Sequence, residues 1–266
     1  MISKQQGVSI FFPCYNDAKS IKSLVENAFS TIKRFTTKYE VIVIDDCSYD
    51  SSRKVLQRLA KKYRRLKLIF HDKNYGYGGA LRSGFKKAKY ELIFYTDGDG
   101  QYDVKELPVL LYLMNKDVDF INGIKMSRHD PTYRIVIGNI YSLLIRWLFW
   151  VPIIDVDCDF RLIRKSLLDK FDLKSNSGSI CIELIKKSQI TGAKFRQVSV
   201  RHLERRDGVS QFFRVERILQ TFKEVSILWV KLMVLRNLIR LLKTRGLQFI
   251  LPASYNPIHA VQKQAR

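Results

Sequence analysis

Short apolar runs alternate with amphipathic stretches over the first 125 residues of this chain. Four runs, at 8–12, 40–44, 66–70 and 92–96, consist largely of Val, Ile, Leu and Phe. Strands of this kind are buried on both faces, which occurs when helices cover the two sides of a parallel sheet. The alternation therefore predicts an α/β fold with a mostly parallel sheet flanked by helices. The first strand is expected to end before Pro13.

Apolar residues at helical spacing fill the stretches between these runs. They predict helices over 17–37, 50–65 and 80–88, and after residue 125 a weaker pattern predicts helices over 166–171 and 180–188 and a strand over 194–200. The chain contains no internal repeat and no low-complexity linker. One main domain followed by a C-terminal extension is therefore expected.

The composition points to an anionic partner and a reducing compartment. Lys and Arg number 47 against 25 Asp and Glu, which gives a net charge of +22 at pH 7. Nucleic acid, an anionic membrane surface and phosphorylated substrates would all suit such a chain. Cys14, Cys47, Cys158 and Cys181 lie far apart without metal-ligand spacing, and the N-terminus carries no secretory signal. Reduced thiols in a cytosolic compartment are therefore expected.

Oxygen-bearing side chains follow the run 92–96. Asp97, Asp99 and Gln101 alternate there with two glycines. Ligands of parallel α/β sheets bind at the carboxyl ends of the strands. Mg²⁺ and Mn²⁺ take oxygen ligands, commonly one or two carboxylates together with substrate phosphates. The stretch therefore predicts a divalent metal site, with a turn whose carboxylates cap backbone amides as the alternative.

Two further segments bring polar or flexible residues to strand ends. Asp46 follows the second run, where a carboxylate can accept hydrogen bonds from a ribose or a base, whereas Asp50 or Ser51 can equally cap the next helix. Farther on, Asn74 and Gly78 belong to a glycine-rich stretch before a helix, which lets a backbone approach a phosphate. That stretch does not fit the dinucleotide-binding fingerprint. The chain also lacks a GxxxxGK[ST] loop, which excludes a P-loop ATPase.

Taken in this order, the segments resemble those of the inverting family 2 glycosyltransferases, which have the GT-A fold. The resemblance covers about residues 7–215, and its DxDxQ stretch is similar to that of the dolichyl-phosphate mannosyltransferase-like, polyprenyl-phosphate branch. It implies a UDP- or GDP-linked sugar donor, a dolichyl or undecaprenyl phosphate acceptor, and an Mg²⁺ or Mn²⁺ ion on Asp97, Asp99 and Gln101. The residues implied for donor binding are Pro13, Tyr15, Asn16, Asp46, Asn74, Gly78, Arg205 and Ser210.

The resemblance also implies an acceptor site formed by residues from Lys125 onward. Lys125, Arg128 and Arg134 fall where the branch places basic residues that grip the acceptor phosphate. Two stretches resemble further elements of the branch. The stretch 157–161 resembles its Gly-Phe-Arg element, with Asp159 where Gly is usual, and 205–210 resembles its R-x-x-G-x-S element near the active-site lid.

The implied catalytic groups are Asp97, Asp99, Arg128 and Arg134. The ion would neutralise the donor diphosphate, and the arginines would position the acceptor. A phosphate monoester is already anionic near neutral pH, so no strong general base is required. Direct displacement implies inversion at the anomeric carbon.

Two segments suit a membrane surface. The stretch 140–154 is apolar apart from Arg146, and at about 1.5 Å per residue it is shorter than a hydrocarbon core of roughly 30 Å. The C-terminal stretch mixes apolar and basic residues at helical spacing, which favours a helix in the interface over one that spans the membrane. We expect a catalytic domain over 1–211, a membrane-associating extension over 212–266 and a peripheral location on the cytoplasmic face. An ordinary core helix is the alternative for 140–154, and an integral membrane partner remains open.

Other functions and donors stay open beside this interpretation. A growing surface glycan is the alternative acceptor, and a basic nucleic-acid-binding protein is the alternative of another class. The chain has no helix-turn-helix, zinc-finger or RNP-type motif, and its acidic strand ends would repel nucleic-acid phosphates unless a metal were bound. No nucleic-acid partner is therefore expected. UDP-glucose, UDP-N-acetylglucosamine and GDP-mannose all remain possible donors.

Overall fold

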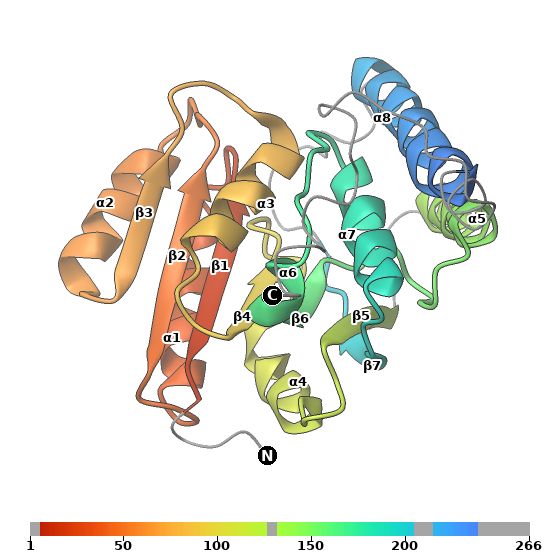
Figure 1. Ribbon diagram of the computed structural model, residues 1–266. Coiled ribbons are helices and arrows are strands. Elements are labelled where there is room, and N and C mark those ends of the chain that lie inside the picture. Colours follow the sequence, from red (N-terminus) through yellow and green to blue (C-terminus); the bar gives the residue numbers. More distant parts are fainter. Residues whose placement is uncertain (1–5, 127–131, 205–214, 239–266) are drawn as a thin grey trace, which may run out of the picture.

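The computed structural model describes residues 6–126, 132–204 and 215–238 of the chain. In this part of the chain, seven strands form one sheet in the order β3-β2-β1-β4-β6-β5-β7 (Figure 1). The strands are β1 (Val8–Cys14), β2 (Tyr39–Asp45), β3 (Leu66–Phe70), β4 (Leu92–Thr96), β5 (Phe120–Met126), β6 (Phe160–Arg164) and β7 (Phe195–Arg201). Strand β6 runs antiparallel to both of its neighbours, and all other pairs are parallel. The predicted mostly parallel sheet is confirmed.

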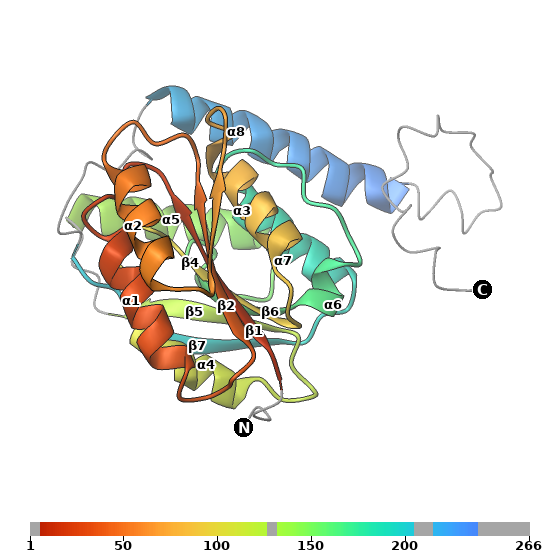
Figure 2. The same cartoon turned by 90° about the vertical axis from the view of Figure 1, so that its left-hand side faces the viewer.

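Helices cover both faces of the sheet (Figure 2). They are α1 (Ile21–Ile32), α2 (Ser52–Lys62), α3 (Gly76–Lys87), α4 (Leu107–Leu113), α5 (Thr132–Phe149), α6 (Lys165–Leu168), α7 (Ser179–Ile190) and α8 (Val215–Trp229), with a 3₁₀ turn η1 (Val104–Glu106) and a π-helical turn η2 (Val230–Leu235). Apolar residues of α1, α2 and α4 share one core cluster. Residues of α3, α5, α7 and α8 share the other.

The central strands contribute to both cores because successive side chains point to opposite faces. In β1, Val8, Ile10 and Phe12 enter the α1 side, whereas Phe11 enters the α3 side. All seven residues of β1 are buried. This two-sided burial is the reason that the strands read as continuous apolar runs.

Strand β1 continues through Pro13 to Cys14, so the prediction that it ends before Pro13 is wrong by two residues. The pairing explains how the strand accommodates a residue without an N–H group. Strand β1 pairs with β4 only over Val8–Phe11, and beyond Phe11 only the pairing with β2 goes on, as far as Cys14 opposite Asp45. Pro13 therefore lies where only one side of the strand is paired.

Other boundaries also differ from the prediction. Helix α3 begins at Gly76, four residues before the predicted start at Ala80, and β5 and β6 were not predicted. The glycine-rich turn is helical because another segment packs closely against it. A Cβ atom at Gly78 would lie 2.2 Å from the carbonyl oxygen of Ser175. A residue with poor intrinsic helix propensity is thus retained for close packing.

The described part of the C-terminal stretch packs onto the main domain. Val225, Leu228 and Leu232 join the core cluster that also contains Phe149 of α5. The indole Nε1–H of Trp229 donates to the carbonyl oxygen of Leu148 over 3.0 Å, which ties α8 to α5. Within the described residues, no helix has the length and hydropathy of a membrane span.

Candidate active site

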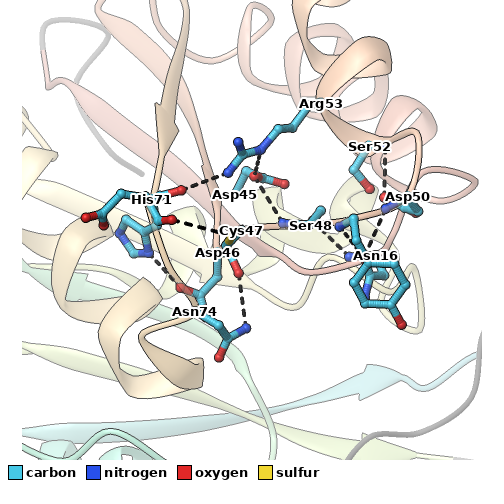
Figure 3. Close-up of polar contacts among 12 residues, drawn as sticks. Asn16, Asp45, Asp46, Cys47, Ser48, Asp50, Ser52, Arg53, His71 and Asn74 are labelled. Carbon is cyan, nitrogen blue, oxygen red and sulfur yellow. Dashed lines mark hydrogen bonds and ion pairs between the residues drawn. The ribbon is translucent and has the colours of Figure 1, made fainter.

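Three adjacent parallel strands bring the predicted donor residues to one edge of the sheet. Strand β1 lies between β2 and β4, and all three point their carboxyl ends the same way. Tyr15 and Asn16 follow β1, Asp46 follows β2, and Asp97 follows β4. Figure 3 shows the β1 and β2 part of this edge, including Asn16 and Asp46. The sheet thus assembles segments that are far apart in sequence.

The two aspartates at the end of β2 have different surroundings. Asp45 is fully buried, and its Oδ2 accepts from Nε of Arg53 over 2.6 Å. Asp46 contacts a different part of the chain. Its Oδ1 accepts from the backbone N–H of Tyr75 over 2.8 Å and lies 2.7 Å from Nδ1 of His71. Asp45 therefore anchors α2 to the sheet, and Asp46 is the aspartate that adjoins the glycine-rich segment. The role of Asp46 in donor binding stays a prediction.

Asn16 connects the loops after β1 and β2. Its backbone has a φ of 61°, a left-handed conformation that Asn tolerates better than most residues. Its side-chain Oδ1 accepts from the N–H groups of Tyr49 and Asp50 over 3.0 and 3.3 Å. Its Nδ2 is buried and has no hydrogen-bond partner within the described chain. A buried donor without a partner at this edge is available to an acceptor atom of a ligand.

The contacts of Asp50 fit the alternative interpretation that it caps the N-terminus of the next helix. Its Oδ1 accepts from the backbone N–H of Ser52, the first residue of α2, over 2.8 Å. Its Oδ2 accepts from the N–H of Ala18 over 3.1 Å. Asp50 therefore joins the start of α2 to the β1 loop and has a structural role in the site.

The predicted metal-binding loop folds back onto the end of β1. A Cβ atom at Gly98 would lie 2.3 Å from the carbonyl oxygen of Pro13, so only glycine permits this approach. The hydroxyl of Ser20 donates to the carbonyl oxygen of Gly98 over 2.7 Å. Pro13 thus supports the loop through its backbone. A direct contact of its side chain with a donor stays a prediction.

The carboxylates of this loop accept hydrogen bonds from the protein and lie near other negative charges. Oδ1 of Asp97 accepts from the hydroxyl of Tyr77 over 2.7 Å, and Oδ1 of Asp99 accepts from the N–H of Gln101 over 3.0 Å. Burial, together with the negative charges of Asp159 and Asp99, raises the pKa of the Asp97 carboxyl well above its ordinary value. Nearby carboxylates repel each other, and a bound cation would offset this repulsion.

The donor set fits a divalent cation that is shared with a substrate. Within the residues that the structure describes, no group of three or more His, Cys, Asp or Glu could hold a metal ion unaided. The loop offers two carboxylates and the amide oxygen of Gln101. Mg²⁺ and Mn²⁺ accept such incomplete protein sets when phosphate oxygens and water supply the remaining ligands.

Asn74 and Gly78 have structural partners in the glycine-rich segment. The side chain of Asn74 donates to the carbonyl oxygen of Asp46 and accepts from the N–H of Gly76, each over 3.1 Å. The N–H of Gly78 donates to the carbonyl oxygen of Asn176 over 2.9 Å. These contacts account for both residues without a ligand, and their contribution to donor binding stays a prediction.

Several predicted site residues lie outside the described residues. This applies to Arg128 of the predicted acceptor site and to Arg205 and Ser210 of the predicted donor site, and only the backbone of Arg134 is described, in the first turn of α5. Lys125 lies at the end of β5, where its Nζ donates to the carbonyl oxygen of Asp157 over 2.9 Å. The acceptor roles of the arginines therefore stay predictions.

Asp159, which replaces the usual Gly, has a partner in the buried Arg161. The guanidinium of Arg161 is fully buried, and its Nη1 lies 3.0 Å from Oδ1 of Asp159. The same guanidinium donates to the hydroxyl of Tyr95 over 2.5 Å and to Oδ1 of Asn122 over 2.7 Å. The carboxylate at this position thus compensates a buried positive charge.

Two residues of the site were not identified from the sequence. His71 follows β3 directly and contacts Asp46, and Tyr77 of α3 contacts Asp97. The position of His71 after a strand is the same signal that identified Asp46 and Asp97. Tyr77 had no comparable signal, because a tyrosine among glycines fits a surface turn equally well.

Known proteins of one family are similar to this chain. The model of glycosyl transferase family 2 matches residues 9–172, which is more than half of the chain. The chain is 26% identical over 206 residues to the undecaprenyl-phosphate 4-deoxy-4-formamido-L-arabinose transferase of Pseudomonas savastanoi pv. phaseolicola, covering 77% of this chain and 60% of that protein. A protein of the same description from Pectobacterium atrosepticum is 24% identical over 213 residues, with 80% and 64% covered. The chain therefore spans about 60% of the length of these relatives.

Solved structures show the same fold. Glucosyl-3-phosphoglycerate synthase from Mycobacterium tuberculosis, in complex with Mn²⁺, UDP and glucosyl-3-phosphoglycerate, matches with a TM-score of 0.64 at 13% identity, covering 92% of this chain and 82% of that one. At this identity the likeness concerns the fold alone, and it confirms the predicted GT-A architecture. The matched residues 9–172 contain the ends of β1, β2 and β4 that form the candidate site, and this chain belongs to glycosyl transferase family 2.

Proposed function

We propose that the protein transfers a sugar from a UDP- or GDP-linked donor to a polyprenyl phosphate, with inversion and with a divalent metal ion. The observation that carries this proposal is that Asp46, Asp97 and Asp99 follow the ends of β2 and β4, which flank β1 at one edge of the parallel sheet. In the proposal, Asp46 accepts hydrogen bonds from a nucleoside, and the loop after β4 holds a diphosphate through a cation. The names of the relatives support a polyprenyl phosphate as the acceptor class.

The residues of the chain would bind and align two anionic reactants. Asp97, Asp99 and Gln101 would hold the ion, which when bound would neutralise the charge of the leaving nucleoside diphosphate. Arg128 and Arg134 would orient the acceptor phosphate, because a guanidinium binds phosphate oxygens in a bidentate manner. Alignment of this kind can lower the barrier by about 7–11 kcal/mol. The acceptor oxygen is already anionic, so its attack on the anomeric carbon needs no strong base.

A screen of nucleotide sugars tests the proposed reaction. UDP-glucose, UDP-N-acetylglucosamine and GDP-mannose would each be incubated with the full-length protein, a short polyprenyl phosphate, and Mg²⁺ or Mn²⁺. We expect one donor to yield a lipid-linked sugar of inverted anomeric configuration, and chelation of the metal to stop the reaction. Transfer to a glycan acceptor but not to the lipid phosphate would contradict the proposed acceptor.

An exposed apolar surface on α5 supports a location at a membrane interface. Leu143, Trp147 and Trp150 are 63%, 71% and 73% exposed, although such side chains usually lie in a core. Further exposed apolar residues of α5 are Val136, Ile137, Ile140 and Leu144, and α8 carries the exposed residues Leu219 and Phe222. Exposed basic residues, including Arg146 on α5 and Lys223 on α8, accompany them. We infer that α5 and the extension 212–266 contact the anionic cytoplasmic leaflet, with tryptophans at the headgroup level.

Replacement of one tryptophan on this surface tests the membrane contact. Trp147→Glu is expected to weaken binding to vesicles that contain anionic phosphatidylglycerol about tenfold, because a large apolar group no longer leaves water. Co-sedimentation with the vesicles measures the affinity. Tyr112→Glu is the matched control, since Tyr112 is 63% exposed but lies on α4. Equal effects of the two substitutions would contradict a specific α5 contact.

A further inference from the structure

His71 connects the donor site to helix α3. The residue follows β3, is 9% exposed, and places its Nδ1 2.7 Å from Oδ1 of Asp46 (Figure 3). On the opposite side of the ring, its Nε2 lies 2.9 Å from Oγ of Ser83, which belongs to α3. Both ring nitrogens are therefore engaged by the protein.

The backbone of His71 is fixed as well. Its N–H donates to the carbonyl oxygen of Asp45 over 2.9 Å, and its own carbonyl oxygen accepts from Nη2 of Arg53 over 2.8 Å. Arg53 also binds the Asp45 carboxylate, so one side chain of α2 clamps the ends of β2 and β3. These two backbone hydrogen bonds fix the position of His71 at the end of β3.

The partners of the ring determine where its proton lies. A carboxylate only accepts hydrogen bonds, so Nδ1 carries a proton and donates it to Asp46. In the neutral tautomer that this bond selects, Nε2 accepts from the hydroxyl of Ser83. In this arrangement neither nitrogen is left for a substrate, and His71 can act on a ligand only through Asp46.

Asp46 is consequently held in one orientation as an acceptor. Its Oδ1 receives both His71 and the N–H of Tyr75, the residue that precedes α3. Two donors on one oxygen fix the plane of the carboxylate. A ligand that binds the remaining acceptor capacity must supply an O–H or N–H group, as the ribose or base of a nucleotide does.

We propose that His71 is a positioning residue for nucleoside recognition: it orients the Asp46 carboxylate toward the donor, and Ser83 fixes its tautomer. This proposal rests on the proposed function, since it takes the edge formed by β1, β2 and β4 to bind a nucleoside diphosphate. It assigns to His71 an effect on donor affinity and none on the acceptor.

A pair of near-isosteric substitutions separates positioning from mere packing. In His71→Asn the amide nitrogen takes the place of Nδ1 and can still donate to Asp46. In His71→Gln the amide lies nearer to the place of Nε2, and the bond to Asp46 is lost. Calorimetric titration of the full-length protein with UDP and with GDP, each with Mn²⁺, gives the dissociation constants. For the nucleotide that the wild type binds, we expect a change of less than about threefold for His71→Asn and a loss of about tenfold or more for His71→Gln.

Two further measurements keep the proposal testable if a variant folds poorly. In ¹⁵N-labelled wild-type protein, the resonances of the neutral form of His71 should show the tautomer that carries its proton on Nδ1. In transfer assays, His71→Gln should raise the KM for the donor and leave the KM for the polyprenyl phosphate unchanged. A neutral ring that carries its proton on Nε2, or equal affinities of both variants for the nucleotide, would overturn the proposal. A wild-type protein that binds neither UDP nor GDP would overturn the proposed function and this inference with it.

Discussion

Asp99→Asn is expected to lower kcat/KM for sugar transfer by about 10²–10³-fold, the range found when one preorganised group that stabilises developing charge is removed. The substitution keeps the size of the side chain and its acceptor for the N–H of Gln101, which lies 3.0 Å away. It removes one negative charge from the loop that is proposed to hold the cation. The chain should therefore fold normally while the donor diphosphate loses its counterion. Initial rates of transfer at several Mn²⁺ concentrations measure the effect.

A matched control uses an aspartate far from the site. The side chain of Asp117 is 81% exposed and lies 3.3 Å from Nζ of Lys194. Asp117→Asn should leave the rates unchanged. Transfer by Asp99→Asn at the wild-type rate, and without any dependence on divalent ions, would refute a role of this loop in holding a metal.

Asp159→Ala is expected to lower the free energy of unfolding by about 3–5 kcal/mol, because it leaves a buried guanidinium without its counter-charge. Arg161 is fully buried, and Oδ1 of Asp159 lies 3.0 Å from its Nη1. The hydrogen bonds of Arg161 to Tyr95, Asn122 and Val156 would remain but carry no opposing charge. Urea unfolding followed by circular dichroism gives the difference.

Two other substitutions calibrate this stability effect. Asp159→Asn keeps an acceptor beside Arg161 but removes the negative charge. It should therefore lower the free energy of unfolding by less than Asp159→Ala does. Asp117→Ala breaks an exposed ion pair with Lys194 and should cost less than about 1 kcal/mol. If Asp159→Ala were no less stable than Asp117→Ala, the buried pair would not compensate Arg161 as we conclude.

The first half of the fold could be predicted because its signals are local. The run 92–96 coincides with β4, since a strand buried on both faces reads as unbroken apolar sequence. Strands β5 and β6 lack this signal. Their pairing brings Asn122 opposite Arg161, two polar residues that are buried because they bind each other. A local sequence pattern cannot predict a contact between residues so far apart in sequence.

The candidate site was predicted to a similar extent and for a similar reason. Asp46 and Asp97 stand out as carboxylates at the ends of apolar strands. Asn74 and Gly78 were predicted from a different signal, the glycine-rich stretch before a helix, and their observed partners are backbone groups of this chain. His71 gives no pattern of spacing, and its contact with Asp46 depends on how β2 and β3 pair. Motifs therefore identified the sheet edge, whereas the supporting contacts required the three-dimensional structure.

The proposed metal and donor site is tested most directly by the position of a metal ion in crystals soaked with MnCl₂ and the nucleoside diphosphate that the protein binds. Anomalous scattering locates manganese without any assumption about its ligands. We predict one manganese ion at the end of β4, bonded to Asp99 and to a phosphate oxygen, with the nucleoside next to Asp46. A bound nucleotide with no manganese at that loop, and with Asp97 and Asp99 hydrogen-bonded only to protein, would contradict this prediction.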